Sequence, residues 1–510
     1  MFAEAAYLFR HALLRAGAYE LQLQSERARL HALAAHILLS LFGRPPSPEH
    51  EPYADFRPDG SDIVAPELAQ HARLADDRSL TGIAWLCSWR AARASHTQFN
   101  HTASLPQYEA VYDDDSAPPR VRAAALWRAS MAARFVGRFD LAIGHATRGL
   151  DVARGHDDTD GIAWCLNSRG AAFSTQGQSS SADTDLRAAC EFTQARCGPV
   201  QQSVALGQLG IHLQATGRGT EAEDVLHRAL ELARQAGDAR REGAWHGMLA
   251  RIMNRSGRRE VGSVHLQRAI EISRDMNDHV NEGTWLLDLG ASLTYAGQHD
   301  QARATFKQAL QLLTAAGDQI GASIAVGNMG VAHANENRLD LAQACYLEAV
   351  QWARNAGARP YIGLWLGNLG TVHNNRNELD AAAAAFAEAR DIAASTGDSE
   401  RAALWTGNLG DTEYRRGNYT AARQGLNTAI ASARRTNDLR LLGIWHGKLS
   451  IVLVADGDYA AASDAWKASV GSLEKAGLQA QSAELYSELA RFMRAKGMEP
   501  GSLAAPFATT

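Results

Sequence analysis

One small-residue position recurs every 40 residues through most of this chain of 510 residues. Two Ala-rich columns keep the same step, and a column of bulky residues lies between them, as in Ala382, Phe386 and Ala389. A repeat of about 20 to 50 residues indicates a solenoid, in which each unit buries its apolar face against its neighbours. The pattern predicts an array rather than a conventional enzyme core. The recurring small residues are Gly170, Gly210, Ala250, Gly290, Gly330, Gly370, Gly410 and Ser450.

Each repeat is predicted to contain two helices and two tight turns. The small and bulky columns are spaced i, i+4 and i+7, which places them on one face of a helix. One column contains only Gly or Asn, such as Gly417 and Asn377, and a second such column follows about 20 residues later, as in Gly397 and Asn437. Because Gly and Asn enter the left-handed region of backbone space at low cost, both columns mark helix ends.

These residues resemble the tetratricopeptide repeat, in which a Leu-Gly pair late in helix A precedes Ala, a bulky residue and Ala on helix B. Leu369, Gly370, Ala382, Phe386 and Ala389 match that motif. The usual proline that closes helix B is missing, so helix B can continue for another turn. The repeat is therefore similar to the 40-residue class of kinesin light chains, Leu-Gly-Asn repeat proteins and bacterial regulators. The resemblance implies an all-α fold, a right-handed superhelical solenoid of antiparallel helix pairs.

The repeat pattern predicts how the chain is divided. A partial repeat is a candidate at the start, because Ala5, Phe9 and Ala12 reproduce the helix B columns. A stretch rich in proline and without helical period reads as a loop. The predicted parts are N-terminal helices at 1–43, a Pro-rich loop or linker at 44–70, a degenerate helical repeat at 71–120, nine helix pairs at 121–480, a capping helix at 481–497 and a flexible tail at 498–510.

Composition and motifs argue against several function classes. The net charge of −5 and the absence of a block of like charges do not favour nonspecific binding to nucleic acid or to an anionic membrane. No leader sequence or membrane span is predicted, so the cytoplasm is the expected location. The five cysteines lack a Cys-x-x-Cys pair, which favours buried free thiols. Phosphate-loop, dinucleotide, zinc-protease and nucleophile-elbow motifs are missing, and neither catalysis nor a cofactor or metal is predicted.

The resemblance implies that the helix A residues just before the Leu-Gly pair face a concave groove. Asn328, Asn368 and Asn408 occupy that position in three successive repeats. Each carboxamide offers a donor and an acceptor, which suits the main chain of an extended peptide. The alternative is that the three residues are merely tolerated polar surface.

Arginines are predicted to add two electropositive subsites to this groove. Arg251 and Arg255 come from one repeat together with Asn254, whereas Arg401 and Arg415 flank the Asn ladder with Asp411. Arg binds carboxylates in a bidentate manner, so an acidic peptide or a C-terminal carboxylate is the expected partner. The alternative is solvated surface arginine, and the oligomeric state stays open.

Two further columns carry packing information. Gly in a helix costs about 1 kcal/mol relative to Ala, so a Gly column inside helix A indicates a steric reason, either packing or clearance for a ligand. A Trp column lies on the buried stripe and is predicted to fill the core between repeats. The Gly column is Gly207, Gly247, Gly327, Gly367, Gly407 and Gly447, and the Trp column is Trp245, Trp285, Trp365, Trp405 and Trp445.

The leading hypothesis is a protein–protein interaction scaffold that binds a peptide or protein segment in its groove. A second hypothesis is the sensor or regulatory arm of a larger bacterial signalling or transcription-regulatory system. A third is an enzyme or metal protein that uses the irregular N-terminal region. The third hypothesis rests on His96, His101, Asp113, Asp114 and Asp115.

Overall fold

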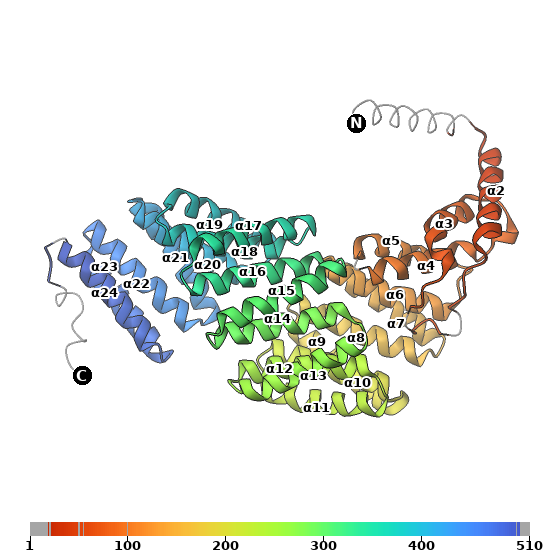
Figure 1. Ribbon diagram of the computed structural model, residues 1–510, viewed down its shortest axis with the longest axis horizontal. Helices are drawn as coiled ribbons and strands as arrows, with labels where there is room; N and C mark the ends of the chain where they lie inside the picture. Colours follow the sequence, from red (N-terminus) through yellow and green to blue (C-terminus); the bar gives the residue numbers. More distant parts are fainter. Residues whose placement is uncertain are drawn as a thin grey trace. The chain divides into compact units, whose positions relative to one another are not determined.

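The computed structural model describes residues 19, 22–48, 51–54, 56–98, 100–495 and 497–499. Every regular element in these residues is helical, as the sequence predicted (Figure 1). The candidate partial repeat at Ala5, Phe9 and Ala12 and most of the predicted tail lie outside the described residues. The chain divides into two compact units, unit 1 at Met1–Asp278 and unit 2 at His279–Thr510.

Unit 1 contains twelve α-helices and two short 3-10 helices in its described residues. They are α2 (Gln24–Phe42), η1 (Gly60–Val64), α3 (Ala65–Leu74), η2 (Arg78–Leu80), α4 (Ile83–Thr97), α5 (His101–Tyr112), α6 (Pro119–Phe135), α7 (Phe139–Gly155), α8 (Thr159–Thr175), α9 (Ser179–Arg196), α10 (Pro199–Ala215), α11 (Gly219–Gln235), α12 (Ala239–Arg255) and α13 (Arg259–Asp275).

Unit 2 continues the same alternation. Its described helices are α14 (His279–Tyr295), α15 (His299–Ala315), α16 (Gln319–Asn335), α17 (Leu339–Asn355), α18 (Arg359–Asn375), α19 (Leu379–Ser395), α20 (Ser399–Arg415), α21 (Tyr419–Thr436), α22 (Leu439–Asp456), α23 (Tyr459–Lys475) and α24 (Gln479–Ala495). From α6 to α23, each even-numbered helix is helix A of a repeat and packs on the odd-numbered helix B that follows it.

The predicted loop at 44–70 is shorter than its proline content suggested. Residues 60–64 form η1 and residues 65–74 form α3. Pro66 lies in the first turn of α3, where a proline removes no intrahelical hydrogen bond. Asp59 caps η1 by accepting a hydrogen bond from the backbone of Ser61. Pro66 therefore stands at the beginning of a helix instead of preventing one.

The turn columns have the predicted backbone conformation. Asn337 and Asn377, for example, have φ values of 59° and 62°. Cys197 is an exception, because it stands at a Gly or Asn position of the column but caps α9 in an extended conformation with φ −122°. Gly198 then occupies the position where Asp usually follows. The helix ends are thus encoded locally, one residue at a time.

Residues of the Gly column pack against rings of the Trp column. A Cβ atom added to Gly367 would lie 2.3 Å from the ring of Trp405 in the next repeat, and one added to Gly327 would lie 2.5 Å from Trp365. The Trp side chains are 2% to 5% exposed, which confirms the predicted core role. Gly207, Gly327, Gly367 and Gly407 make room for these rings, and Gly447 makes room for Leu485, so the structure supports the packing explanation.

A serine supports the Trp ring in some repeats. In unit 2, Trp365 Nε1 donates to Ser323 Oγ at 2.9 Å, and Ser323 Oγ donates to the Ala349 carbonyl at 2.8 Å. Ala403 replaces this serine in the repeat that packs on Trp445. Within the described residues, the buried Trp445 Nε1 has no hydrogen-bond partner. The hydrogen bond between serine and Trp is therefore present in some repeats and missing from others.

Removing or adding this serine should change stability in opposite directions. We expect Ser323→Ala to lower the free energy of unfolding by about 1–2 kcal/mol, because the Trp365 N–H loses its acceptor in a dry site. Ala403→Ser should raise it by about 1 kcal/mol, because the new hydroxyl can accept from Trp445. Urea unfolding followed by circular dichroism measures both, and a loss of stability in both variants would contradict this explanation.

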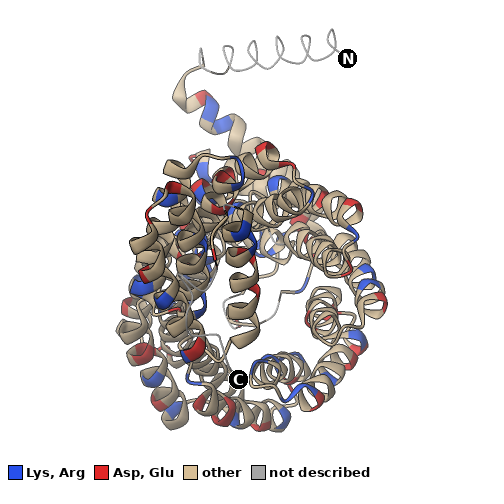
Figure 2. Ribbon diagram, turned by 90° about the vertical axis from the view of Figure 1, so that its left-hand side faces the viewer, with Lys and Arg blue, Asp and Glu red and all other residues tan. Residues whose placement is uncertain are grey.

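The sequence's mixed charge is also seen in the fold. Lys and Arg are interspersed with Asp and Glu over the helices as a whole (Figure 2), although α6 carries four arginines and no acidic residue. No helix in the described part of the chain is both long and apolar enough to cross a membrane.

Candidate functional site

Three asparagines lie in register on neighbouring A helices of unit 2. Asn328 is in α16, Asn368 in α18 and Asn408 in α20, and these helices pack on one another in that order (Figure 1). All three side chains are half-buried. None of the three carboxamides has a side-chain hydrogen-bond partner among the residues that the structure describes. The row therefore keeps its donors and acceptors available.

Aliphatic side chains border the asparagines. Ile324, Leu364 and Leu404 stand four residues before them and hence on the same side of each helix. They are half-buried, and their inner parts pack against the hydrophobic core. We call the surface formed by these three aliphatic residues and the three asparagines the amide face. It combines apolar contact area with evenly spaced hydrogen-bonding groups.

A closed ion-pair cluster ends the amide face. Lys448 occupies the next position of the column, in α22, and its Nζ lies 3.1 Å from Asp411 Oδ1 and 2.8 Å from Glu488 Oε2 of α24. Burial opposes the charge on Lys448, but the two carboxylates outweigh burial and raise the pKa of the ammonium group. Asp411 is therefore bound to Lys448 and does not pair with a predicted subsite arginine.

The two arginines predicted beside the asparagines bind elsewhere. Arg401 Nη1 lies 2.8 Å from Asp398 Oδ2, at the start of α20. Arg415 Nη1, at the end of α20, donates to the Asn374 carbonyl at 2.7 Å. These ends of one helix are about 20 Å apart. The two arginines therefore lie at opposite ends of α20 and do not form one subsite. Each binds a group of the protein itself.

The other predicted subsite lies in unit 1, in the last turns of α12. Arg251 is half-buried with Nη1 3.7 Å from the sulfur of Met248, and Arg255 is exposed. Asn254 points to α13, because a Cβ atom added to Gly262 would lie 2.3 Å from Asn254 Oδ1. The asparagine therefore belongs to helix packing and does not complete an anion site with Arg255.

The comparison with known families agrees with this repeat geometry. A sequence model described as "Tetratricopeptide repeat" matches residues 201–275 and 244–315, and a second matches residues 325–355. The chain contains tetratricopeptide repeats. No curated protein matches the sequence significantly.

Solved structures with tetratricopeptide repeats share the fold at low sequence identity. A signal transduction ATPase with numerous domains from Pyrococcus horikoshii, which has a tetratricopeptide repeat sensor, is 14% identical, with a TM-score of 0.53 over 83% of this chain and 74% of that chain. The apo form of RapI is 11% identical, with a TM-score of 0.50 over 70% of this chain and 98% of its own. Identities this low show similarity of fold alone.

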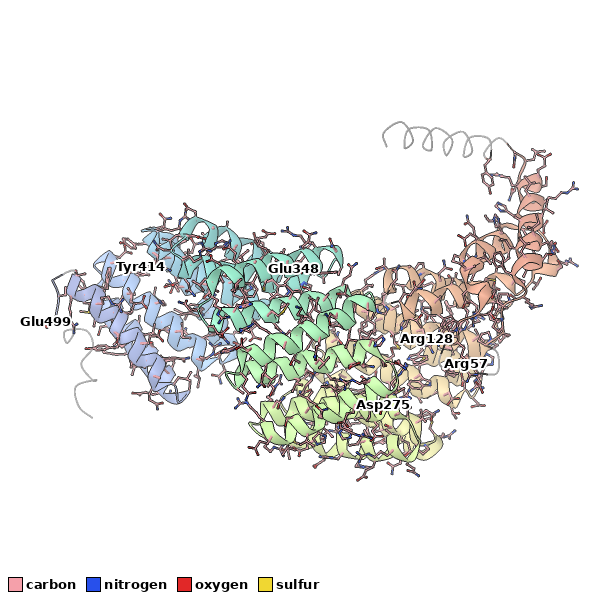
Figure 3. The ribbon with its side chains drawn as sticks, in the orientation of Figure 1. Arg57, Arg128, Asp275, Glu348, Tyr414 and Glu499 are labelled. Carbon is pink, nitrogen blue, oxygen red and sulfur yellow. The ribbon has the colours of Figure 1, made fainter. Side chains whose placement is uncertain are left out.

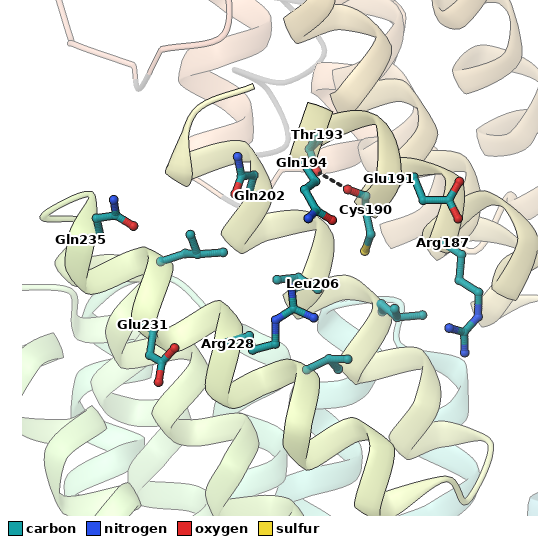
Figure 4. Close-up of a pocket in the computed structure, with 13 residues that line it drawn as sticks. Arg187, Cys190, Glu191, Thr193, Gln194, Gln202, Leu206, Arg228, Glu231 and Gln235 are labelled. Carbon is teal, nitrogen blue, oxygen red and sulfur yellow. Dashed lines mark hydrogen bonds between the residues drawn. The ribbon is translucent and has the colours of Figure 1, made fainter. Parts of the chain in front are cut away.

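Pockets lie at corresponding positions of the repeats in unit 1 and in unit 2. One of about 410 Å³ is enclosed by α9, α10 and α11, with Leu206 in its wall and Arg228 beside it (Figure 4). Two pockets of about 530 and 440 Å³ lie at the equivalent position in unit 2, and Thr406 of α20 lines both of them. Thr406 precedes Asn408 by two residues, or about 200° around a helix. Pockets and asparagines therefore occupy different sides of helix A.

Burial disfavours the thiolate form of the cysteine beside the first pocket. Burial raises the pKa of Cys190 to about 11, so the thiolate is scarce at neutral pH. The cysteines are free, as predicted, but only Cys87 and Cys165 are fully buried. Cys190, Cys197 and Cys345 are half-buried, which corrects the prediction of buried thiols.

The acid and histidine residues of the N-terminal region do not converge. The rings of His96 and His101 are 4.8 Å apart, and His101 stacks on Phe135 at 4.5 Å. Asp113 follows the other end of α5, about 18 Å along the helix axis. In the described part of the chain, no group of three or more His, Cys, Asp or Glu side chains could hold a metal ion. The geometry gives no support to the metal hypothesis at this place.

Sequence reasoning missed a contact between the predicted linker and the first repeats. Arg93 and Arg128 donate to the backbone carbonyl of Ala54, which lies in the loop before η1. A signal existed, because Arg128 precedes Asn328 by 200 residues, which is five repeats of 40 residues. The same column therefore carries arginine in α6 and asparagine in α16.

Proposed function

We propose that this protein binds an extended protein segment on the amide face. The observation that supports this proposal most is the row of Asn328, Asn368 and Asn408, three half-buried carboxamides at one position of neighbouring helices. Packed helices are about 8–10 Å apart, and an extended chain advances about 3.3 Å per residue. Each asparagine would therefore meet roughly every third residue of the bound segment.

The chemistry of the amide face fits a main chain better than a charged group. A carboxamide can accept from one backbone N–H and donate to one backbone C=O. Lys448 is the cation that continues the row, and Asp411 and Glu488 neutralise it. We therefore propose a partner segment with apolar side chains against Leu364 and its neighbours, and not an acidic or C-terminal peptide, at this surface.

We propose that the bound segment is held and not chemically altered. The same surface could serve a scaffold or the sensory arm of a signalling protein, and the Pyrococcus horikoshii relative is described as having a tetratricopeptide repeat sensor. The second hypothesis predicts an effector domain in the coding sequence beside this one. A neighbouring sequence without such a domain would leave the scaffold as the better description.

Peptide selection tests the proposal without knowledge of the natural partner. Peptides of random sequence displayed on phage are selected on the wild-type protein, and the Kd of the best peptide is measured by fluorescence anisotropy. We expect the triple variant Asn328→Ala, Asn368→Ala and Asn408→Ala to bind about 10 to 100 times more weakly, since each lost hydrogen bond contributes about 0.5–1.5 kcal/mol.

A matched control separates this effect from general surface changes. Asn355→Ala with Asn427→Ala removes two carboxamides from B helices, at the end of α17 and on α21, and should leave the Kd unchanged. Circular dichroism must show that all variants are folded. Equal affinity of wild type and triple variant for every selected peptide would refute binding on the amide face.

A further inference from the structure

A segment of the chain that contains a turn lies across α4, α6 and the start of α8 in unit 1. We call residues 51–59 the strap, of which 51–54 and 56–59 are described. Tyr53 reaches the start of α8, Ala54 lies at α6 and α4, and Phe56 and Arg57 lie at α4. Figure 3 shows Arg57 and Arg128 in this part of the molecule. The strap therefore crosses successive A helices, as a bound segment would.

Arginine side chains of the A helices hold the main chain of the strap. Arg93 Nη2 donates to the Ala54 carbonyl at 3.0 Å, and Arg128 Nη2 donates to the same oxygen at 3.4 Å. Arg90 Nη2 donates to the Arg57 carbonyl at 2.9 Å. The three arginines are only 5% to 8% exposed. These contacts do not depend on the side chains of the strap, so they would serve another chain segment equally well.

Two aromatic residues anchor the strap and give it selectivity. The Tyr53 hydroxyl donates to Asp158 Oδ2, and its ring centre lies 5.9 Å from that of Trp127. The Phe56 ring lies 4.6 Å from the Arg90 guanidinium. Cation–π contacts of this kind contribute about 0.5–2 kcal/mol. The surface thus has two places for aromatic side chains that are three residues apart.

The strap has little structure of its own to hold it there. It contains a turn closed by a hydrogen bond from the Ala54 N–H to the Glu51 carbonyl, but neither helix nor strand. Most of its described residues are exposed, including Glu51, Ala54 and Arg57, whereas Pro52 is buried. Its hydrogen bonds and ring contacts with α4, α6 and the start of α8 are made by two aromatic anchors and two carbonyl oxygens. A segment of another chain with the same anchors could make every one of these contacts.

We propose that the surface of α4, α6 and α8 beneath the strap is a second binding surface, whose partner is a protein segment without helix or strand that carries aromatic side chains three residues apart. The strap occupies this surface in place of that segment and covers it until the segment displaces the strap. The partner's main-chain carbonyls take the places of those of Ala54 and Arg57, and its aromatic rings replace Tyr53 and Phe56. This surface shares no residue with the amide face.

The test uses the strap itself as the probe. A fluorescent peptide with the sequence of residues 50–60 is titrated with the full chain carrying Tyr53→Ser and Phe56→Ser, and with the wild type. We expect the variant to bind at least about ten times more tightly, because the wild-type surface is free only for the fraction of time that the strap is released. A peptide with both aromatic residues replaced by serine should bind to neither protein.

Two results would overturn the proposal. One is failure of the peptide to bind the folded variant, and the other is equal binding of the peptide to variant and wild type. If circular dichroism shows that the double variant is unfolded, the same comparison is made with Phe56→Ala alone. This single variant keeps the Tyr53–Asp158 hydrogen bond. The amide-face variant with Asn368→Ala should bind the peptide as the wild type does, which separates this proposal from the proposed function.

Discussion

Gly207→Ala is expected to lower the free energy of unfolding of unit 1 by about 3 kcal/mol, at the upper end of the usual cost of overpacking. The new Cβ atom would lie 2.1 Å from the Trp245 ring. The ring cannot easily withdraw, because Trp245 Nε1 donates to Ser203 Oγ at 2.9 Å. Its side chain is also 5% exposed, with core on its other sides. Urea unfolding followed by circular dichroism measures the change.

Gly144→Ala is the matched control for this substitution. Gly144 also lies inside a helix of unit 1, α7, but a Cβ atom added there would have nothing within 4 Å. We expect this variant to be more stable by about 0.5–1 kcal/mol, because alanine restricts the unfolded chain. Similar destabilisation by both variants would show that the cost comes from the helix and not from the Trp ring.

Acidification to about pH 4.5 is expected to lower the stability of unit 1 by about 2–3 kcal/mol through a pair of histidines. Arg234 Nη2 lies 3.0 Å from His246 Nε2 and must be the donor. His246 therefore carries its proton on Nδ1, which lies 2.8 Å from His265 Nδ1. Protonation of His246 would oppose Arg234, and protonation of His265 would oppose His246. The contact thus requires both rings to be neutral.

The pKa of His246 sets the direction of this effect. Burial, His265 and Arg234 lower the pKa from 6.5 to about 4, although Glu242 acts in the opposite direction. The pKa of His265 is lowered by burial, His227 and Arg234, while Glu223 opposes the shift. Below pH 6.5 the unfolded chain binds protons that the folded chain does not. The stabilisation is therefore fully present above that pH and is lost as the pH falls towards 4, by about 1.4 kcal/mol per pH unit for His246, and His265 adds a loss in the same direction.

Urea unfolding at a series of pH values measures this loss. His246→Gln should flatten the profile, because its amide oxygen can accept from Arg234 and its amide nitrogen can donate to His265 without a proton being bound. His156→Gln, at an exposed position after α7, should keep the wild-type profile. An unchanged slope in His246→Gln would mean that other groups cause the acid sensitivity.

Regular features of the fold could be predicted from the sequence because each is decided locally. Asn337 and Asn377 mark helix ends because their left-handed conformation is costly for most other residues. The extent of α3 was missed, since Pro66 in a first helical turn and a proline in a loop look alike in a sequence. The strap was missed because Ala54 lies outside the repeats: the 40-residue period places Arg128 in the column of the asparagines but does not identify its acceptor.

The candidate site could be predicted only in part. Asn328, Asn368 and Asn408 occur once per repeat, and the structure places them on neighbouring helices. The role of the arginines was predicted less well, because each binds an acceptor within the protein instead of a ligand. For Arg401 the signal was present, since Asp398 is a helix cap three residues earlier. For Arg415 it was not, because its acceptor belongs to the preceding repeat.

The most direct test of main-chain recognition by the amide face is a double-mutant cycle between protein and peptide. The Kd of a selected peptide and of its analogue with one N-methylated backbone nitrogen is measured for the wild type and for Asn368→Ala. If Asn368 accepts from that N–H, methylation weakens wild-type binding about tenfold and leaves Asn368→Ala unaffected, a coupling of about 1.4 kcal/mol. Equal losses in both proteins, at every methylated position, would contradict the account.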